Sequence, residues 1–235
     1  MSNPRILFWD IETAGVNALK ADLGFCLMVG YKWAGDKEAS ILTIKKKDLK
    51  TVNDGPLLTE FSRIYNEADL TVAHFGSVFD RRFIQGRLMI NKLPPIPFTK
   101  MRDTCMSMRS IANYSSNRLN TLGNTLSLEN KKIEKGSGWP GWWFRAMQGD
   151  MSAIEEMAVY CKGDVLALEE LYYRLLPFDN AHPRMHHLAE RQSCAKCGGT
   201  VQYHGVAFTK TAKYHRFQCN ECGSWGRDTK SIKEG

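Results

Sequence analysis

The sequence predicts an α/β protein, with a mixed five-stranded sheet flanked by helices and a small cysteine-rich module after it. Three observations support this prediction. Three strand-like apolar segments come first, and strand-like and helix-like patterns then alternate. Four of the seven cysteines form two Cys-x-x-Cys pairs near the C-terminus. Hydrophobic residues make up 43% of the chain and charged residues 24%, which is enough for an ordinary core.

The first three predicted strands form an antiparallel ribbon, because short turns join them. They span residues 5–11, 25–33 and 40–44. The first strand is apolar on both faces, which indicates a central position in the sheet. Gly35 and Asp36 mark a hairpin turn between the second and third strands. The lysine run at 45–47 is interpreted as a solvated end of the third strand.

Helices and two further strands alternate after this ribbon, which predicts parallel crossovers. The predicted strands span residues 70–75 and 98–103, and the predicted helices span residues 56–66, 79–89, 104–128 in two pieces, and 150 or 152 to 176. An aromatic segment at 136–143 is predicted to be a loop. The aromatic residues from Trp139 to Arg145 either stack on unpaired bases or form a hydrophobic clasp over the core, and the clasp is the favoured interpretation.

The composition predicts a nucleic-acid partner and no membrane contact. The net charge is +7, and residues 181–235 contribute +5 of it, with nine Lys and Arg against four Asp and Glu. This surplus favours a polyanion, although a solubilising tail would have the same composition. No apolar stretch is long enough to span a bilayer, and the N-terminus has no secretory pattern. A cytoplasmic location is expected, and the design would suit a bacterium or a phage-infected host cell.

Two carboxylates follow the apolar run of the first strand. Asp10 and Glu12 are two positions apart, so they point to the same face of that strand. Burying such a pair costs free energy unless the carboxylates are paired or bind a metal ion. Carboxylate oxygens are ligands that hard cations prefer, so this pair predicts half of a Mg²⁺ or Mn²⁺ site.

Two more acids and a tyrosine complete the candidate site. Asp80 lies near the first turn of the helix that follows the fourth strand. The simpler interpretation of Asp80 is a negative charge that the helix dipole stabilises. Tyr160 and Asp164 are four residues apart in the last helix and share a face among apolar neighbours. Several acids from different elements suit phosphodiester hydrolysis with two metal ions. A tyrosine, with a reference pKa near 10, is a better orienting group than a general base.

These motifs resemble those of the DEDD 3′–5′ exonuclease family, in its tyrosine-bearing, proofreading-type branch. The resemblance rests on Asp10-Ile11-Glu12-Thr13, on Phe79-Asp80 and on Tyr160 four residues before Asp164, in the family's order. It covers roughly residues 5–176. It implies a ribonuclease H-like fold and a metal-dependent 3′–5′ exonuclease that acts on single-stranded or frayed DNA ends.

The resemblance also implies residue roles. Asp10 would bridge two Mg²⁺ or Mn²⁺ ions, Glu12 and Asp164 would complete the shell of one ion, and Asp80 would serve the other. Tyr160 would contact the attacking water. Thr13, His74 and Phe79 are possible substrate-binding residues, with His74 weighed slightly towards a structural role. Many relatives carry His-Asn where this chain has His74-Phe75, so a contact made by that Asn is in doubt. Asp103 and Thr104 follow the family's pattern in a supporting role.

The last four cysteines predict a structural zinc site. Cys194 and Cys197 form one pair and Cys219 and Cys222 the other, and two such pairs complete a tetrahedral Zn²⁺ site of the zinc-ribbon type. Glycines after each pair permit tight turns, and strands are expected at 201–203 and 214–218. Catalytic disulfides are the disfavoured alternative. The other three cysteines (Cys26, Cys105 and Cys161) are predicted to be core residues.

The predicted domains are residues 1–178, a linker at 179–190 and a zinc ribbon at 191–235. Lys213, Tyr214 and Arg216 interleave charge with an aromatic ring, which suits a nucleic-acid strand, while protein docking or simple stabilisation are the alternatives. The chain has no room for a polymerase domain, so a polymerase or another replication or repair protein is a possible partner. An RNA-trimming exonuclease, a non-catalytic nucleic-acid-binding adaptor and a structure-specific endonuclease on the same fold are the competing functions.

Overall fold

The computed structural model describes residues 4–130, 139–186 and 193–232. It divides into two compact units, Met1–Tyr172 and Tyr173–Gly235. The first unit holds a five-stranded sheet with helices around it, which confirms the predicted α/β fold class. The predicted domain boundaries stay a prediction, and the last four residues of the predicted linker, 187–190, lie outside the described residues.

The sheet of the first unit has the strand order β3-β2-β1-β4-β5. Its strands are β1 (Ile6–Gly15), β2 (Gly24–Trp33), β3 (Ser40–Thr43), β4 (Leu70–Ala73) and β5 (Lys100–Asp103). The β1-β2 and β2-β3 pairs are antiparallel, and the β1-β4 and β4-β5 pairs are parallel. The mixed sheet with β1 in its centre is therefore the one that the strand pattern predicts.

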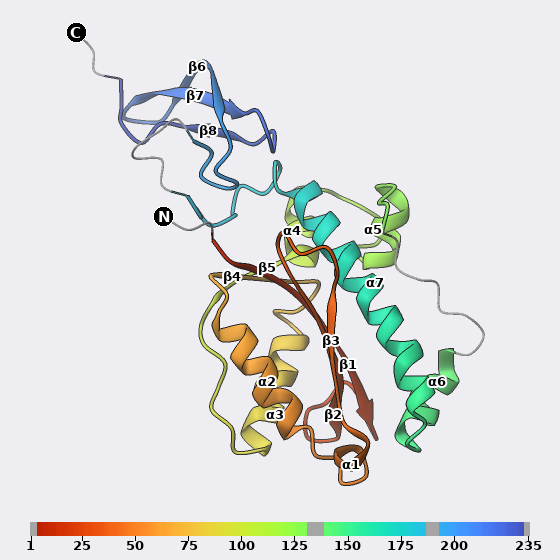
Figure 1. The fold of residues 1–235 in the computed structure, drawn as a ribbon. Helices are drawn as coiled ribbons and strands as arrows, with labels where there is room; N and C mark the ends of the chain where they lie inside the picture. Colours follow the sequence, from red (N-terminus) through yellow and green to blue (C-terminus); the bar gives the residue numbers. More distant parts are fainter. Residues whose placement is uncertain (1–3, 131–138, 187–192, 233–235) are drawn as a thin grey trace. The chain divides into compact units, whose positions relative to one another are not determined.

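The helices lie on both faces of the sheet. They are α1 (Lys46–Leu49), α2 (Gly55–Asn66), α3 (Asp80–Ile90), α4 (Thr104–Ile111), α5 (Leu119–Thr125), α6 (Trp139–Met147) and α7 (Met151–Leu175). In Figure 1, α2 and α3 lie on one side of the sheet and α7 on the other.

Alternate residues of β1 pack on these two sides. The ring of Trp9 lies 5.2 Å from the ring of Phe61 in α2, measured between centroids. The ring of Phe8 lies 5.4 Å from the ring of Tyr172 in α7. Because successive side chains of a strand point to opposite faces, the even-numbered positions of β1 face α7. This alternation directs Asp10 towards the helix that carries Tyr160 and Asp164.

Strand β1 is longer than predicted. It continues to Gly15, four residues past the predicted end at Ile11, because β2 offers backbone partners as far as Gly24. The register shifts between Glu12 and Thr13, which marks a β-bulge. Bulges often occur beside functional sites, where they redirect side chains. Asp10 and Glu12 therefore lie inside the strand and directly before the bulge.

Two segments have a different structure from the one predicted. The lysine run does not simply end the third strand, because Lys46 and Lys47 begin the short helix α1, which the buried side chain of Leu49 anchors. The predicted loop at 136–143 becomes helical from Trp139 onwards, while 136–138 lie outside the described residues. A proline is tolerated in the first turn of a helix, so Pro140 did not exclude this helix.

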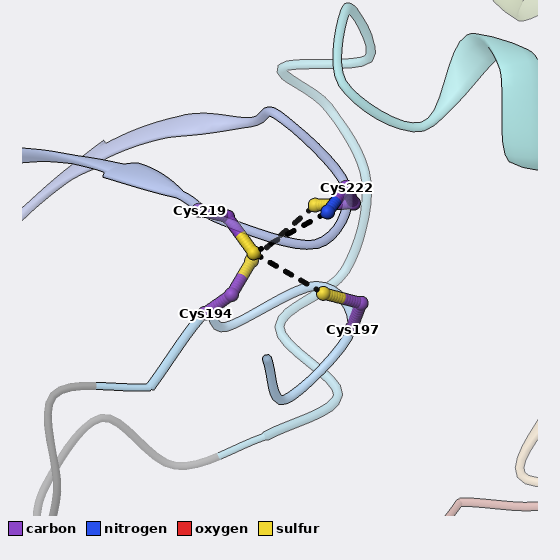
Figure 2. Close-up of side chains that lie close together, drawn as sticks. All are labelled: Cys194, Cys197, Cys219 and Cys222. Carbon is purple, nitrogen blue, oxygen red and sulfur yellow. Dashed lines mark hydrogen bonds between the residues drawn. The ribbon is translucent and has the colours of Figure 1, made fainter. Parts of the chain in front are cut away.

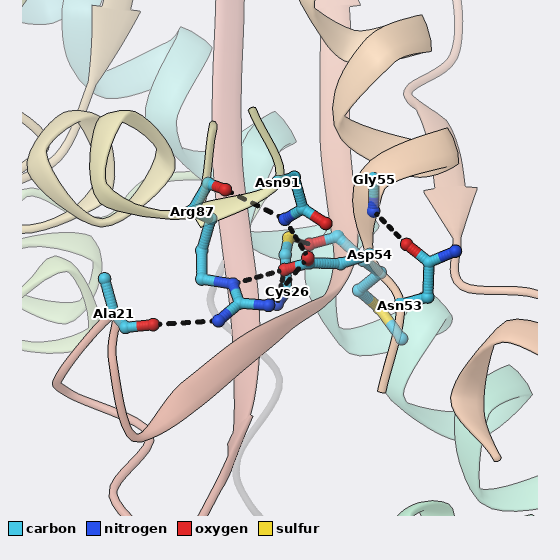
Figure 3. Close-up of polar contacts among 8 residues, drawn as sticks. Ala21, Cys26, Asn53, Asp54, Gly55, Arg87 and Asn91 are labelled. Carbon is cyan, nitrogen blue, oxygen red and sulfur yellow. Dashed lines mark hydrogen bonds and ion pairs between the residues drawn. The ribbon is translucent and has the colours of Figure 1, made fainter. Parts of the chain in front are cut away.

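A buried ionic network joins β2, α2 and α3 (Figure 3). Asp54 is fully buried, and its two carboxylate oxygens accept hydrogen bonds from Nε and Nη2 of Arg87, each at 2.9 Å. Cys26 N and Asn91 Nδ2 donate to the same carboxylate, at 2.9 and 2.8 Å. Arg87 also donates to the carbonyl oxygen of Ala21, at 3.0 Å. The network fixes α3, the helix that begins at Asp80, against the β1-β2 ribbon.

The second unit contains a three-stranded antiparallel sheet with the order β6-β7-β8. Its strands are β6 (Val201–Phe208), β7 (Lys213–Cys219) and β8 (Trp225–Arg227). The two predicted strands are present, and both are longer than predicted. The third strand was not predicted, because three residues around Gly226 carry too little pattern. Among the described residues, no helix is long and apolar enough to cross a membrane.

Candidate functional site

A cavity of about 910 Å³ in the first unit contains the predicted acidic residues. Asp10, Glu12, Asp80, Tyr160 and Asp164 all line it, and so do His74 and Phe79. They come from β1, from the segment after β4, and from α3 and α7, so the fold gathers residues that are far apart in the sequence.

Three of the acids form a tight group. One carboxylate oxygen from each of Asp10, Glu12 and Asp164 lies within 4.8 Å of the others. Two oxygens that bind the same Mg²⁺ at about 2.1 Å can be at most about 4.2 Å apart, so side chains whose oxygens lie within 4.8 Å need at most a small adjustment to share one ion. The strand supplies two carboxylates on one face, and α7 supplies the third from the layer that packs on that face. The group could therefore hold Mg²⁺ or Mn²⁺.

Asp80 lines the same cavity but is not a member of the tight group. It is the first residue of α3, and its side chain is only 4% exposed. The pKa of Asp80 is raised to about 7, mainly by burial and to a smaller extent by the charge of Asp103, while hydrogen bonds from the backbone of Asp80 and Ile11 oppose the shift. A carboxyl group in this state releases its proton when a cation binds beside it.

Asp103 fixes the turn that leads from β4 into α3. Its carboxylate accepts hydrogen bonds from Phe75 N at 2.9 Å and from Ser77 N at 3.0 Å. It also caps α4, because Cys105 N and Met106 N donate to the same side chain. Phe75 adopts a φ of +66°, a left-handed conformation that an Asn tolerates better than a Phe. The supporting role predicted for Asp103 has this structural basis.

His74 is held by the protein on both sides of its ring. Nδ1 lies 2.9 Å from Thr104 Oγ1, and Nε2 lies 2.8 Å from the carbonyl oxygen of Asn117. A carbonyl oxygen can only accept, so Nε2 carries a proton and donates it there. These contacts favour a structural role for His74, although it also lines the cavity.

Helix α6 covers the end of β1 and the ring of Tyr160. Trp143 Nε1 donates to the carbonyl oxygen of Thr13 at 2.9 Å, and the ring of Trp142 lies edge-on to Tyr160 with centroids 6.2 Å apart. Both tryptophans pack against the hydrophobic core. The clasp was therefore the better interpretation of this aromatic segment.

Thr13 does not line the cavity. Its side chain is 7% exposed, and its hydroxyl donates to the carbonyl oxygen of Ala18 at 2.7 Å. The predicted contact between Thr13 and the substrate stays a prediction. The buried hydroxyl of Thr13 favours a structural role, in which it holds the strand after the bulge.

The polar wall of the cavity was not predicted from the sequence. The segment from the end of α4 to the start of α5 contributes Arg109, Ser115, Ser116, Asn117, Arg118 and Asn120 to the lining. A second cavity of about 460 Å³ shares Arg109 and Asn117 with the first. The interruption between the two helical pieces was visible in the sequence. Its richness in Ser, Asn and Arg was the available signal, but no motif assigns a role to such a loop.

The second unit brings the four predicted cysteines together (Figure 2). Their sulfur atoms all lie within 4.8 Å of one another. Cys194 Sγ is 3.7 Å from Cys222 Sγ, and Cys197 Sγ is 3.5 Å from Cys219 Sγ. Four thiolates arranged tetrahedrally at 2.3 Å from Zn²⁺ would be about 3.8 Å apart, whereas a disulfide would bring two sulfurs to about 2.0 Å. The cluster therefore fits a zinc ion and no disulfide.

The two Cys-x-x-Cys turns have the same local structure. Gly198 and Gly223 follow them with φ of +79° and +76°, and their N–H groups donate to the carbonyl oxygens of Cys194 and Cys219. Gly199 N donates to Cys197 Sγ at 3.4 Å, as expected for a turn that surrounds a thiolate. Burial raises the pKa of the Cys197 thiol, and a bound cation would lower it again by stabilising the thiolate.

The predicted substrate-binding residues of the second unit lie on β7. Lys213 and Arg216 are exposed, and Tyr214 is half-buried beneath Arg227. They belong to the second unit, whereas the cavity lies in the first.

The comparisons with known proteins agree with the fold. A family B DNA polymerase from the hyperthermophilic archaeon Pyrobaculum calidifontis is among 159 similar chains of solved structures, with a TM-score of 0.56 and 12% identity. The match covers 76% of this chain but only 26% of the polymerase, so it shows the fold alone. A comparison with curated protein sequences found no significant match. The family model of the RNase H superfamily matches residues 7–176, which is more than half of the chain. The chain therefore belongs to the RNase H superfamily.

Proposed function

We propose that this protein is a metal-dependent 3′–5′ exonuclease that hydrolyses DNA at single-stranded or frayed 3′ ends. One observation carries the proposal. The oxygens of Asp10, Glu12 and Asp164 converge within 4.8 Å in a cavity that Asp80 and Tyr160 also line. Superfamily membership supports a nuclease. The order of the acidic motifs supports the 3′–5′ direction through their resemblance to the tyrosine-bearing DEDD exonucleases.

The carboxylates of the cavity would hold two Mg²⁺ or Mn²⁺ ions. When bound, such a pair of ions activates the attacking water and stabilises the leaving oxygen of a phosphodiester. The tight group of three acids fits the ligands of one ion, and Asp10 would also help to hold the second. Asp80, which lies in the same cavity outside that group, would serve the second ion. The donor set consists of hard carboxylate oxygens, which suits these cations better than zinc or copper.

Tyr160 would orient the reacting groups. It lies one helical turn before Asp164, its side chain is 2% exposed, and Trp142 packs against its ring. A phenol held in this way can direct its hydroxyl at a water or at a phosphate oxygen without a rotamer search. Phe79, at the N-terminus of α3 beside Asp80, would contact the terminal nucleotide.

The polar wall would bind the rest of the strand. The exposed side chains of Arg109 and Arg118 line the cavity that also holds the acids. Arginine pairs with phosphate through parallel N–H bonds, so these two residues suit a polyanion. The second cavity continues from Arg109 past Asn113 and Tyr114, which is room for further nucleotides. A chain of nucleotides fits this arrangement better than a small phosphate ester does.

We also propose that the four cysteines hold one structural zinc ion in a zinc ribbon. All four ligand positions would be filled by protein thiolates, so this ion would fold the module and not catalyse. We further propose DNA as the substrate and a polymerase or another replication or repair protein as a partner, in keeping with the fold that this chain shares with part of a DNA polymerase.

The test uses the whole chain and four labelled substrates with Mg²⁺ or Mn²⁺. A 5′-labelled single-stranded DNA should shorten stepwise from its 3′ end, a frayed duplex should follow, and a circular single strand should stay intact. An RNA of the same sequence distinguishes an RNA-trimming enzyme. Asp10→Asn and Asp164→Asn should both be inactive. Equal activity of these variants and the parent protein would overturn the catalytic assignment, and cleavage of the circle would indicate an endonuclease.

A further inference from the structure

We propose that one face of the β6-β7-β8 sheet binds an unpaired DNA strand through arginines stacked on aromatic rings. This inference rests on the proposed function only in taking DNA as the substrate. The face is formed by five side chains, two arginines, two aromatic rings and a histidine, which are His204, Tyr214, Arg216, Trp225 and Arg227.

Strand pairing puts these residues on one face. Arg216 pairs directly with Arg227, and Gln218 pairs with Trp225, so the side chains of each pair point to the same side. Tyr214 lies two residues before Arg216 on β7 and therefore shares its face. This stacked face, as we call the set of five residues, extends across the central strand of the sheet.

The arginines are held over the aromatic rings. Cζ of Arg227 lies 3.9 Å from the ring centroid of Tyr214, and Cζ of Arg216 lies 4.9 Å from that of Trp225. Arg216 Nε also donates to the carbonyl oxygen of His204 at 3.0 Å, and the rings of His204 and Trp225 are 5.6 Å apart. Arginines fixed in this way lose less rotamer entropy when they bind phosphate, so the face is preorganised.

The opposite face of the sheet has another purpose. Phe217 is buried there and covers Gly226, where an added Cβ would lie 2.5 Å from the ring. The hydroxyl of Tyr203 donates to Asp228 at 2.8 Å, and His215 packs edge-on against the ring of Tyr203. That side has a hydrophobic centre and an acid. Lys213 alternates with Tyr214 and lies with His215, so it is not part of the stacked face.

Charge and exposure identify the occupant. Residues 173–235 carry ten Lys and Arg against five Asp and Glu, and this balance stays positive even if four thiolates around one Zn²⁺ add a charge of −2. Trp225 is 49% exposed despite its contact with Arg216. Guanidinium groups bind phosphates, and an exposed indole stacks on bases that a duplex would hide. An unpaired strand offers both groups together.

The test measures binding by fluorescence anisotropy of a labelled 20-nucleotide oligothymidylate, with zinc-loaded full-length protein in an Asp164→Asn background that prevents hydrolysis. Arg216→Gln/Arg227→Gln removes two charges from the stacked face. Lys210→Gln/Lys230→Gln removes two exposed charges elsewhere in the same unit and is the matched control. We expect the first pair to weaken binding about 10-fold or more and the control about 2-fold or less. The slope of log K against log salt should fall by about 1.4 for two lost phosphate contacts.

Trp225→Leu tests the stacking separately. It should weaken binding about 10-fold without changing the salt slope, because stacking of a ring on a base involves no phosphate charge. It should also reduce the preference for the single strand over a blunt duplex. A Trp225→Leu variant with parental affinity and preference would overturn the stacking role.

Two outcomes would overturn the stacked face. If both double variants lose affinity equally, the module attracts DNA through diffuse charge, and if neither does, it does not bind DNA there. The zinc content of each variant shows whether its second unit is folded. If Arg216→Gln/Arg227→Gln has lost its zinc, Arg216→Lys/Arg227→Lys is measured in its place. Parental affinity of that lysine pair would contradict the need for planar guanidinium groups. If the parent protein degrades DNA normally while these tests fail, only this inference fails. If it binds as expected but hydrolyses nothing, the proposed function fails and the stacked face stands.

Discussion

The cavity of the first unit and the cysteine cluster of the second are two metal-binding arrangements built in opposite ways. The cavity collects carboxylates from β1, α3 and α7. The cluster takes its sulfurs from two short turns, and backbone hydrogen bonds within a few residues hold each turn. The first arrangement depends on long-range packing, and the second depends on local backbone geometry.

Their surroundings explain the difference. Behind the carboxylates lies a core that includes Trp9, Phe61 and Tyr65. Among the described residues of the second unit, Phe217 is the one aromatic side chain that is buried. A unit with so little apolar burial needs another source of folding free energy, and bound zinc is the usual one. The fold therefore forms the first site, whereas a bound metal ion would stabilise the fold of the second unit.

Removal of zinc should have the largest structural effect. Cys194→Ser, or a strong chelator, should unfold the second unit, because structural zinc contributes about 10 kcal/mol or more to such a module. Amide NMR spectra should lose the β6–β8 signals while those of the first unit remain. A sheet that survives with no zinc bound would show that the unit folds on its own small core.

Loss of one carboxylate should cost less in structure and much in rate. Asp164→Asn should reduce exonuclease activity by about 1,000-fold or more, because several kcal/mol of transition-state stabilisation depend on the metal ions. Circular dichroism and zinc content should not change, since the core behind the site is intact. Glu155→Gln, an exposed substitution on the same helix, is the control. A similar loss in both variants would point to α7 itself and away from the cavity.

Tyr160→Phe should have a smaller effect that separates orientation from metal binding. The loss of one hydrogen bond to a charged reacting group costs about 1.5–3 kcal/mol, which corresponds to a fall in kcat of about 10- to 100-fold. Affinity for Mn²⁺, measured by calorimetry, should stay at the parental value. Weaker Mn²⁺ binding would instead place the hydroxyl among the ligands.

The smallest effect is expected from Asp80, whose raised pKa should make the stability of the metal-free protein depend on pH. Burial raises the pKa of Asp80 from 3.8 to about 7, so the folded chain holds this proton more tightly than the unfolded chain. Stability should therefore fall as the pH rises from about 4 to about 7 and then level off. At pH 8 Asp80→Asn should raise the Tm of the metal-free protein, by about 3 °C for each kcal/mol relieved.

Saturating Mg²⁺ should remove this difference in Tm, because the ion stabilises the charged carboxylate of the parent protein. A variant that is less stable than the parent at pH 8 without metal would show that the Asp80 carboxylate is not strained there.

Features that depend on residue type and spacing alone could be predicted from the sequence. The apolar run of β1 and the alternation of its positions predicted the central strand and the shared face of Asp10 and Glu12. The bulge after Glu12 was not predictable, because it depends on which residues of β2 pair with it. Helix α6 was missed for a related reason. Its proline and glycine favour a loop locally, and packing of Trp142 and Trp143 on the core decides otherwise.

The wall that contains Arg109 and Arg118 shows the same limit. A carboxylate in an apolar strand is unusual, because burying its charge costs free energy, so it indicates a site. An arginine in a polar loop is common and indicates no particular role. Only the placement of that loop beside the cavity gives it a role.

The Asp54–Arg87–Asn91 network has a consequence for how this sequence can change over generations. A single substitution at any of the three positions leaves a buried polar group without its partner, which typically costs several kcal/mol. A concerted replacement by apolar residues of similar size can be neutral. Substitutions at these three positions are therefore expected to occur together during evolution. Helix α3 and the aspartate at its N-terminus should then keep their position in the fold.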